Sequence, residues 1–194
     1  MTRSATVERR TAETAITASW NLDVAGEATI ETGIGFFDHM LAALAKHSGT
    51  TLAVTCSGDL HVDGHHTSED VGIALGQALR QALGERAGVE RFGHIACPLD
   101  EALVSASVDL SGRPCLVYAL SPAAPMLGGW DRELVPEFFG ALCDHARITL
   151  HLHQICGENS HHIVEAAFKA CARALRQAIA ITGTGIPSTK QALD

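Results

Sequence analysis

A short motif of two histidines and a glutamate occurs twice in this chain and constrains its fold more than any other feature. The first copy is His65-His66-Thr67-Ser68-Glu69, and the second is His161-His162-Ile163-Val164-Glu165, which begins 96 positions later. Apolar residues follow each copy with the mixed i, i+3, i+4 spacing of a buried helix, and Gly84 can end the first of these helices. Each copy is therefore predicted to open a helix.

Helix geometry suggests what the motif does. Residues i and i+4 lie on one face, so His65 and Glu69 can bind one ion together. His66 is rotated by roughly 100° around the axis and therefore points toward a different site. Two copies supply four His and two Glu, enough for two metal ions with nitrogen and oxygen ligands. The alternative is two chance His-His pairs that merely cap helices, and the matching positions of the copies argue against it.

The duplication extends beyond these histidines. Residues 78–83 match residues 174–179 at the same offset of 96, and residues 13–19 resemble residues 101–107 at an offset of 88. The chain is therefore predicted to contain two related halves, residues 1–90 and 91–187. A C-terminal tail, residues 188–194, is predicted to close over substrate, and the whole chain forms one functional domain.

Each half is predicted to have the order strand-strand-helix-strand-helix, with the first two strands forming a hairpin. In the first half the strands are expected at 14–22, 26–31 and 50–57, and the first helix at 37–46. In the second half the strands are expected at 101–109, 114–120 and 147–156, and the first helix at 134–143. The predicted fold class is α+β, with two mostly antiparallel four-stranded sheets sandwiching the helices.

Two further residues are candidates to complete the metal sites. His39 starts the first short helix, and Glu137 has the equivalent place in the second half. His47 follows His39 by eight residues, His145 follows Glu137 by eight, and a Thr-Leu strand comes after both. Four ligands per ion, with no thiolate, favour Mn²⁺ or Fe²⁺ over structural zinc. For Glu137, the alternative is a solvated carboxylate at a helix start; His47 is a candidate to touch substrate.

The composition argues against several classes of protein. The chain has 194 residues and a formal net charge of −8 at pH 7, which argues against nucleic acid or an anionic membrane as a partner. No apolar run approaches the ~20 residues needed to cross a bilayer, and residues 1–4 lack the apolar core of a signal peptide. The six cysteines show no CxxC pattern and are expected to be reduced thiols of a cytoplasmic protein.

Two arginines and the C-terminal tail are candidates for binding an anion. Arg113 lies in a Ser-Gly-Arg-Pro turn, where its guanidinium can point at an anion, and Arg91 begins the second half. The tail carries two hydroxyls and an amine, at Ser188, Thr189 and Lys190. It is either an ordinary disordered terminus or a clamp that closes over a phosphate. For the arginines, the alternative is simple surface charge.

Several of these segments occur together in one known family. Residues 35–41, 58–70, 98–102, 109–114 and 159–170 resemble imidazoleglycerol-phosphate dehydratase, and the resemblance extends from about Thr6 to Lys190. It implies a fold of the ribosomal protein S5 domain 2-like type. It also implies dehydration of D-erythro-imidazoleglycerol 3-phosphate to imidazoleacetol phosphate in histidine biosynthesis, with two Mn²⁺ ions per active site. The resemblance further implies self-association into a large shell of 24 subunits, with active sites at subunit contacts.

The resemblance also implies roles for individual residues. The implied metal ligands are His39, His65, His66, Glu69, His161, His162 and Glu165, and the internal repeat adds Glu137 as the eighth candidate ligand. The implied substrate-binding residues are Glu13, Arg91, Arg113, Lys169, Ser188, Thr189 and Lys190. This chain has Glu137 where His is usual in the family, and Ala43 where a substrate-binding Gln is common.

The chemistry of this reaction explains the need for metal. The proton to be removed sits on a carbon with no adjacent carbonyl, so the imidazole ring must act as the electron sink. Our hypothesis is that two cations hold the ring as imidazolate, so that loss of the hydroxyl and then of the neighbouring proton becomes feasible. Glu165, Glu13 and His47 are the candidate catalytic groups.

Two other functional classes remain open at this point. A hydrolase could use two metals to activate water, and release of inorganic phosphate would reveal it. A metal-linked assembly protein would need no phosphate pocket, so Arg91→Ala and Arg113→Ala would leave it unchanged.

Overall fold

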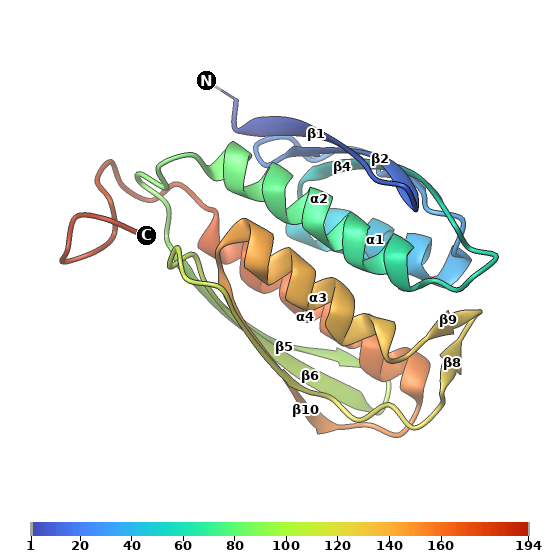
Figure 1. Cartoon of the computed structure of the whole chain (residues 1–194). Coiled ribbons are helices and arrows are strands. Elements are labelled where there is room, and N and C mark those ends of the chain that lie inside the picture. The colour runs from blue at the N-terminus through green and yellow to red at the C-terminus, as the bar shows by residue number, and fades with distance from the viewer. Residues whose placement is uncertain (1, 194) are drawn as a thin grey trace.

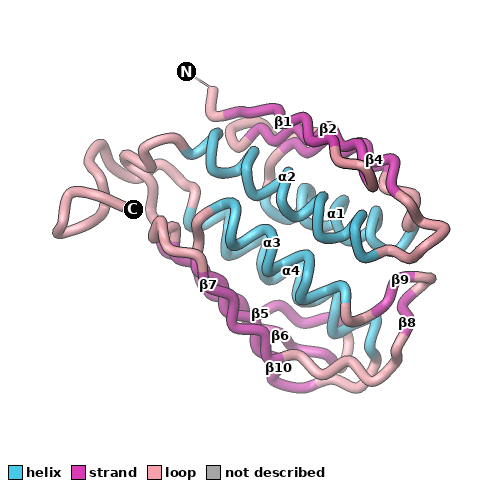
Figure 2. The backbone as a smooth tube through the Cα atoms, viewed as in Figure 1, coloured by secondary structure: helices cyan, strands magenta, loops and turns pink. Residues whose placement is uncertain are grey.

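The computed structural model describes residues 2–193, which form two four-stranded sheets with four helices between them (Figures 1 and 2). The elements of the first half are β1 (Ser4–Arg10), β2 (Thr14–Asn21), β3 (Thr29–Glu31), α1 (Gly35–Ser48), β4 (Thr51–Gly58) and α2 (His65–Leu83). Those of the second half are β5 (Phe92–Leu99), β6 (Ala102–Asp109), β7 (Cys115–Ala119), β8 (Met126–Leu127), β9 (Trp130–Asp131), α3 (Leu134–Ala146), β10 (Thr149–Cys156) and α4 (Ser160–Ala178). The predicted sandwich of helices between two sheets is confirmed.

The pairing of strands differs from the predicted hairpins. The sheets have the orders β1-β2-β4-β3 and β5-β6-β10-β7. β3 pairs with β4 and β7 with β10, both in parallel, so the hairpins predicted for 14–22 with 26–31 and for 101–109 with 114–120 are wrong. A parallel pair needs a crossover, and α1 and α3 supply it. The real hairpins are β1–β2 and β5–β6.

Both first strands, β1 and β5, escaped the sequence analysis. In β1 only Val7 is buried, and most of the other side chains are polar. A strand at the edge of a sheet needs few buried residues, so its apolar alternation is weak. β2 and β6, in contrast, alternate clearly because one face of each covers the helices.

The core lies in the helical layer. α1 and α2 cover the first sheet, α3 and α4 cover the second, and the layers meet where α2 packs on α3 and α1 on α4. Aromatic rings fill the centre: Phe37 stacks on Trp130 with centroids 4.7 Å apart, and Phe138 stacks on Phe168 at 5.5 Å. This packing fixes the helix ends that carry the two histidine motifs.

Glycines set the close approach of α2 to α3. A Cβ on Gly72 would lie 2.7 Å from the carbonyl oxygen of Phe138, and one on Gly76 would lie 2.7 Å from that of Leu142. Their counterparts in α4, counted at the offset of 96, are Phe168 and Ala172. The two helix pairs are therefore related by the duplication but are packed differently.

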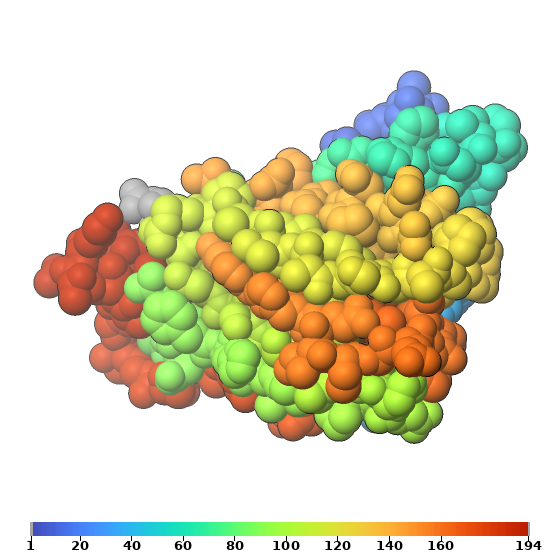
Figure 3. Space-filling model, turned by 90° about the horizontal axis from the view of Figure 1, so that it is seen from below, coloured from blue at the N-terminus to red at the C-terminus, as the bar shows by residue number. Residues whose placement is uncertain are grey.

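In the part of the chain that the structure describes, no helix covers the outer face of the second sheet, and β10 runs across it between its neighbours (Figure 3). The C-terminal tail projects beyond one end of the molecule. Two hydrogen bonds hold it there. The Gly88 N–H donates to the Gly185 carbonyl at 2.8 Å, and the Arg86 guanidinium donates to the Leu193 carbonyl at 3.0 Å. All six cysteines are free thiols. Within residues 2–193, every helix is too short or too polar to cross a bilayer.

Candidate functional site

Three predicted metal ligands converge where α1 meets α4. His39 comes from α1, and His161 and Glu165 come from α4. Glu165 Oε2 lies 2.9 Å from His161 Nε2 and 3.5 Å from His39 Nε2. One ligand atom from each residue lies within 4.8 Å of the others, which suits a single metal ion. Two imidazole nitrogens and a carboxylate oxygen are a donor set for a divalent transition metal.

The start of α4 is built to present this cluster. The Asn159 side chain accepts hydrogen bonds from the N–H groups of His161 and His162 and so caps the helix. Burial alone would raise the pKa of Glu165, but hydrogen bonds from Lys169 and His161 hold this pKa below its ordinary value. Glu165 is therefore an ionised carboxylate with both oxygens engaged, since Lys169 Nζ lies 2.7 Å from Oε1.

The other half carries residues at the matching positions on α2 and α3. His65 and Glu69 occupy the places of His161 and Glu165, and Glu137 occupies the place of His39. His65 Nε2 lies 3.7 Å from Glu69 Oε2, so the set is more open. His65 and Glu137 line one cavity of about 560 Å³. The duplication thus gives the molecule a second group of potential ligands.

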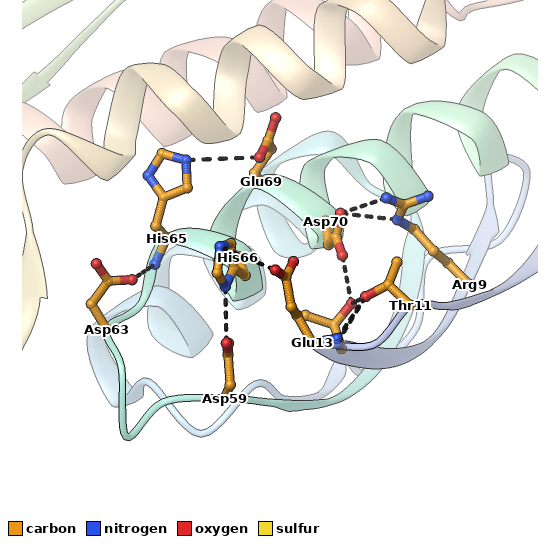
Figure 4. Close-up of polar contacts among 10 residues, drawn as sticks. Arg9, Thr11, Glu13, Asp59, Asp63, His65, His66, Glu69 and Asp70 are labelled. Carbon is orange, nitrogen blue, oxygen red and sulfur yellow. Dashed lines mark hydrogen bonds and ion pairs between the residues drawn. The ribbon is translucent and has the colours of Figure 1, made fainter.

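The second histidine of each motif, His66 or His162, contacts other carboxylates than the first histidine of the same motif does. His66 lies between Asp59, whose Oδ2 is 3.0 Å from Nδ1, and Glu13, whose Oε1 is 3.7 Å from Nε2 (Figure 4). His162 Nδ1 donates to Glu101 Oε2 at 2.7 Å, if that nitrogen carries the proton. Hydrogen bonds to Asp59 and Glu101, respectively, raise the pKa of His66 and of His162.

The carboxylate partner of His162 is strongly acidic. The His162 ring and the backbone N–H groups of Asn159 and Glu158 lower the pKa of Glu101 to about 2. Within one chain, neither His66 nor His162 joins the group formed by the other motif residues. The predicted eight-ligand set is therefore only partly assembled in a single chain.

A basic cavity adjoins the first cluster. His47, Lys169 and Arg173 line a hollow of about 350 Å³ against β5. Burial, followed by the charges of Lys169 and Arg173, lowers the pKa of His47. Ala43 stands one helical turn from both His39 and His47 on α1 and is buried. His47 and Lys169 thus lie together in this hollow.

The remaining predicted anion ligands lie at the opposite end of α4. The Arg91 N–H donates to the carbonyl of Ala178, the last residue of α4, at 2.9 Å. Its guanidinium binds Asp109 through two nitrogens, at 2.8 and 3.2 Å, and the Pro187 carbonyl at 2.9 Å. Ser188, Thr189 and Lys190 follow directly in the tail, and Arg113 is exposed in the nearby β6–β7 turn. Within one chain, these residues therefore lie at the other end of α4 from the metal ligands.

Comparisons with known proteins agree with the motifs. The family model described as imidazoleglycerol-phosphate dehydratase matches residues 32–175. The chain belongs to the imidazoleglycerol-phosphate dehydratase family.

Full-length relatives support the same assignment. The imidazoleglycerol-phosphate dehydratase of Jannaschia sp. is 53% identical over 194 residues, covering 98% of this chain and 100% of the relative. That of Acidiphilium cryptum is 53% identical over 196 residues and covers 100% of both chains.

Solved structures of the family share the fold. The imidazoleglycerol-phosphate dehydratase of Staphylococcus aureus matches with a TM-score of 0.84 and 38% identity, covering 92% of this chain and 99% of that one. The enzyme of Pyrococcus furiosus matches with a TM-score of 0.82 and 39% identity, covering 96% and 100%. The predicted family, the α+β fold class and the enzyme class, a hydro-lyase of histidine biosynthesis, are confirmed.

Sequence reasoning missed two carboxylates of this dehydratase-family site. Glu101 was already aligned with Glu13 in the repeat, and that alignment could have pointed to His162 as its partner. Asp59 stands in the 58–70 segment that carries the resemblance, but its contact with His66 depends on the path of the loop between β4 and α2. The local sequence gave no separate signal for it.

Proposed function

We propose that this protein converts D-erythro-imidazoleglycerol 3-phosphate to imidazoleacetol phosphate with two Mn²⁺ ions per active site. The cluster of His39, His161 and Glu165 is the observation that carries the proposal. Its nitrogen and oxygen donors suit Mn²⁺, and it has a partial repeat in His65, Glu69 and Glu137. When bound, the ions would supply the Lewis acidity that makes the substrate ring an electron sink.

Glu13 is the acid–base group that the geometry favours over Glu165 and His47. Both oxygens of Glu165 are engaged, one by Lys169 and one by the histidines, so this carboxylate is a poor base. The Glu13 side chain is 52% exposed and lies 3.7 Å from His66 Nε2. It is free to move a proton at a substrate bound beside His66, while His47 contributes to the basic cavity.

The phosphate-binding group is proposed to come from a neighbouring subunit. Arg91 lies at the last turn of α4 and His161 at its first, and a 19-residue helix is about 28 Å long. A substrate as small as imidazoleglycerol phosphate cannot bridge that distance. Arg91, Arg113, Ser188, Thr189 and Lys190 of one chain would therefore serve the metal ligands of another. Lys169, beside Glu165, would approach the phosphate from the metal side.

Shared sites require assembly, which fits the expected shell of 24 subunits. His66 and His162, which face outward from the groups of their own half, would complete the ligand sets across the same contacts. Exposed apolar side chains near the His65 cavity, including Val62 at 62% and Met126 at 51%, suit a subunit contact. The free thiols support a cytoplasmic location, because disulfides are rare in that compartment.

A complementation experiment tests both the reaction and the sharing. Arg91→Ala and His161→Ala are each expected to abolish Mn²⁺-dependent formation of imidazoleacetol phosphate. Chains of the two variants, mixed after chelation and reassembled with Mn²⁺, would regain about a quarter of wild-type activity, because a random mixture restores one site in four. No regain, alongside an active reassembled wild-type control, would contradict sharing. An inactive wild-type protein with Mn²⁺ bound would contradict the reaction itself.

A further inference from the structure

The duplication gives each half a glutamate at the same place. Glu13 lies in the β1–β2 turn and Glu101 in the β5–β6 turn, 88 residues later. Each faces the second histidine of its own half, His66 or His162. The two glutamates nevertheless make different contacts, and this difference divides their functions.

Both carboxylate oxygens of Glu101 accept hydrogen bonds from the start of α4 and from the residues just before it. Its Oε2 accepts from His162 Nδ1 at 2.7 Å. Its Oε1 accepts from the backbone N–H groups of Asn159 at 2.8 Å and Glu158 at 3.3 Å. Both oxygens accept hydrogen bonds from within the chain, so Glu101 fixes the histidine ring and a substrate would have to compete with these donors.

In the first half, Asp59 takes over the contact with the histidine. Its Oδ2 lies 3.0 Å from His66 Nδ1, and Glu13 approaches the same ring from another side (Figure 4). The second half has no carboxylate at the equivalent of Asp59: counting back from α4 gives Ile155, and counting on from β10 gives Gly157. Asp59 is thus a feature of the first half alone.

A second aspartate, Asp70, connects the β1–β2 turn to α2, as Glu101 connects the β5–β6 turn to α4. Asp70 Oδ1 accepts from Arg9 at 3.0 and 2.7 Å, and its Oδ2 accepts from the Thr14 hydroxyl at 2.5 Å. The Thr11 hydroxyl accepts from the N–H groups of Glu13 at 3.1 Å and Thr14 at 2.9 Å. In this clamp, the Asp70 side chain, which accepts the bonds from Arg9 and Thr14, is only 8% exposed.

The second half has no such clamp. The counterparts of Arg9, Thr14 and Asp70 are respectively Cys97, Ala102 and Ala166. There the turn is held by Glu101 itself. Where the polar clamp is present the turn glutamate is free, and where the clamp is absent the glutamate is bound.

We propose that Asp59 and Asp70 are positioning residues that release Glu13 for proton transfer. Asp59 receives the Nδ1–H of His66 and orients its Nε2, as carboxylates do behind metal-binding histidines. Asp70 anchors the β1–β2 turn, so Glu13 need not bind its own helix. Glu101, by contrast, serves only to position His162. The role of Glu13 in this inference rests on the proposed function, whereas the contacts of Asp59, Asp70 and Glu101 do not depend on it.

Three single variants separate these roles, each measured for Mn²⁺ affinity of the chelated protein and for kcat at saturating Mn²⁺. Glu101→Gln is expected to weaken Mn²⁺ binding by about 10–100-fold and to recover kcat at saturating metal. Glu13→Gln is expected to keep Mn²⁺ affinity and to lose about 10²–10⁴-fold in kcat. Asp59→Ala is expected to lower both, because His66 becomes free to recruit Glu13.

A double variant tests whether Asp59 acts through Glu13. In the Glu13→Gln background, Asp59→Ala is expected to weaken Mn²⁺ binding without a further loss of kcat at saturating metal. Asp59→Asn serves the same purpose if the alanine variant fails to assemble, and particle size monitors assembly throughout. Equal kcat losses for Glu101→Gln and Glu13→Gln, or independent kcat losses for Asp59 and Glu13, would overturn the division of roles. The dehydratase proposal would fail separately, through an inactive wild-type protein.

Discussion

Packing of α2 on α3 depends on Gly76, and its replacement by alanine gives a quantitative test. A Cβ at this position would lie 2.7 Å from the Leu142 carbonyl oxygen, 2.8 Å from His145 Cβ and 2.9 Å from the Ala146 nitrogen. Two of these atoms are backbone and cannot rotate away, so the helices must separate. Overpacking of this kind typically destabilises a protein by about 1–3 kcal/mol.

Gly140 of α3 provides a matched control. A Cβ there meets nothing within 4 Å. Alanine is favoured over glycine inside a helix by about 1 kcal/mol, and this gain applies to both variants. The difference in unfolding free energy between Gly76→Ala and Gly140→Ala therefore isolates the overpacking, about 1–3 kcal/mol, with Gly76→Ala the less stable.

Thermal unfolding of both chelated variants at one protein concentration measures this difference. For a chain of this size, 1 kcal/mol corresponds to about 2–4 °C in Tm. Gly76→Ala should therefore melt at least 2 °C below Gly140→Ala. Equal Tm values, or a more stable Gly76→Ala, would refute the close packing of α2 on α3.

Three further predictions concern the site. His47 should titrate below its ordinary pKa because of burial and the charges of Lys169 and Arg173. NMR of histidine-labelled, chelated protein should show that Arg173→Met raises this pKa, and no rise would contradict the electrostatic cause. Asn159→Ala should cost about 1 kcal/mol through loss of the α4 cap, seen as a lower Tm, whereas Asn159→Ser should retain most of the stability. Arg91→Ala should loosen the tail around Pro187, because the charge-assisted hydrogen bond to the Pro187 carbonyl, worth about 1.5–3 kcal/mol, is lost while Arg86 still holds Leu193. Limited proteolysis should then cut the tail near Pro187 about tenfold faster, and an unchanged rate would contradict the anchoring role.

The sequence predicts the parts of this fold that have strong local periodicity. The helices α2 and α4 follow from apolar spacing, and the i, i+4 relation correctly brings His161 to Glu165. The duplication also leads to Glu137 as the counterpart of His39, since spacing is preserved between homologous halves. These features depend on neighbouring residues or on a repeat, and both can be read directly from one chain.

Features that depend on long-range pairing were not predictable in the same way. β3 looked like the partner of β2 because a turn joins them, but the α1 crossover brings it beside β4. The bond from Arg91 to Asp109 and the contact of Asp59 with His66 likewise join residues through the fold and not through spacing. Periodicity within a segment contains no information on which segment lies next to it.

The most direct test of the account is a count of the metal ions that activity requires. The chelated protein is titrated with Mn²⁺ while bound metal, particle size and conversion of imidazoleglycerol phosphate are followed together. We predict that activity saturates at two Mn²⁺ per chain, and that Glu137→Ala saturates at one with activity lost. Full activity at one Mn²⁺ per chain, or with none after chelation, would contradict a site built from both halves of the duplication.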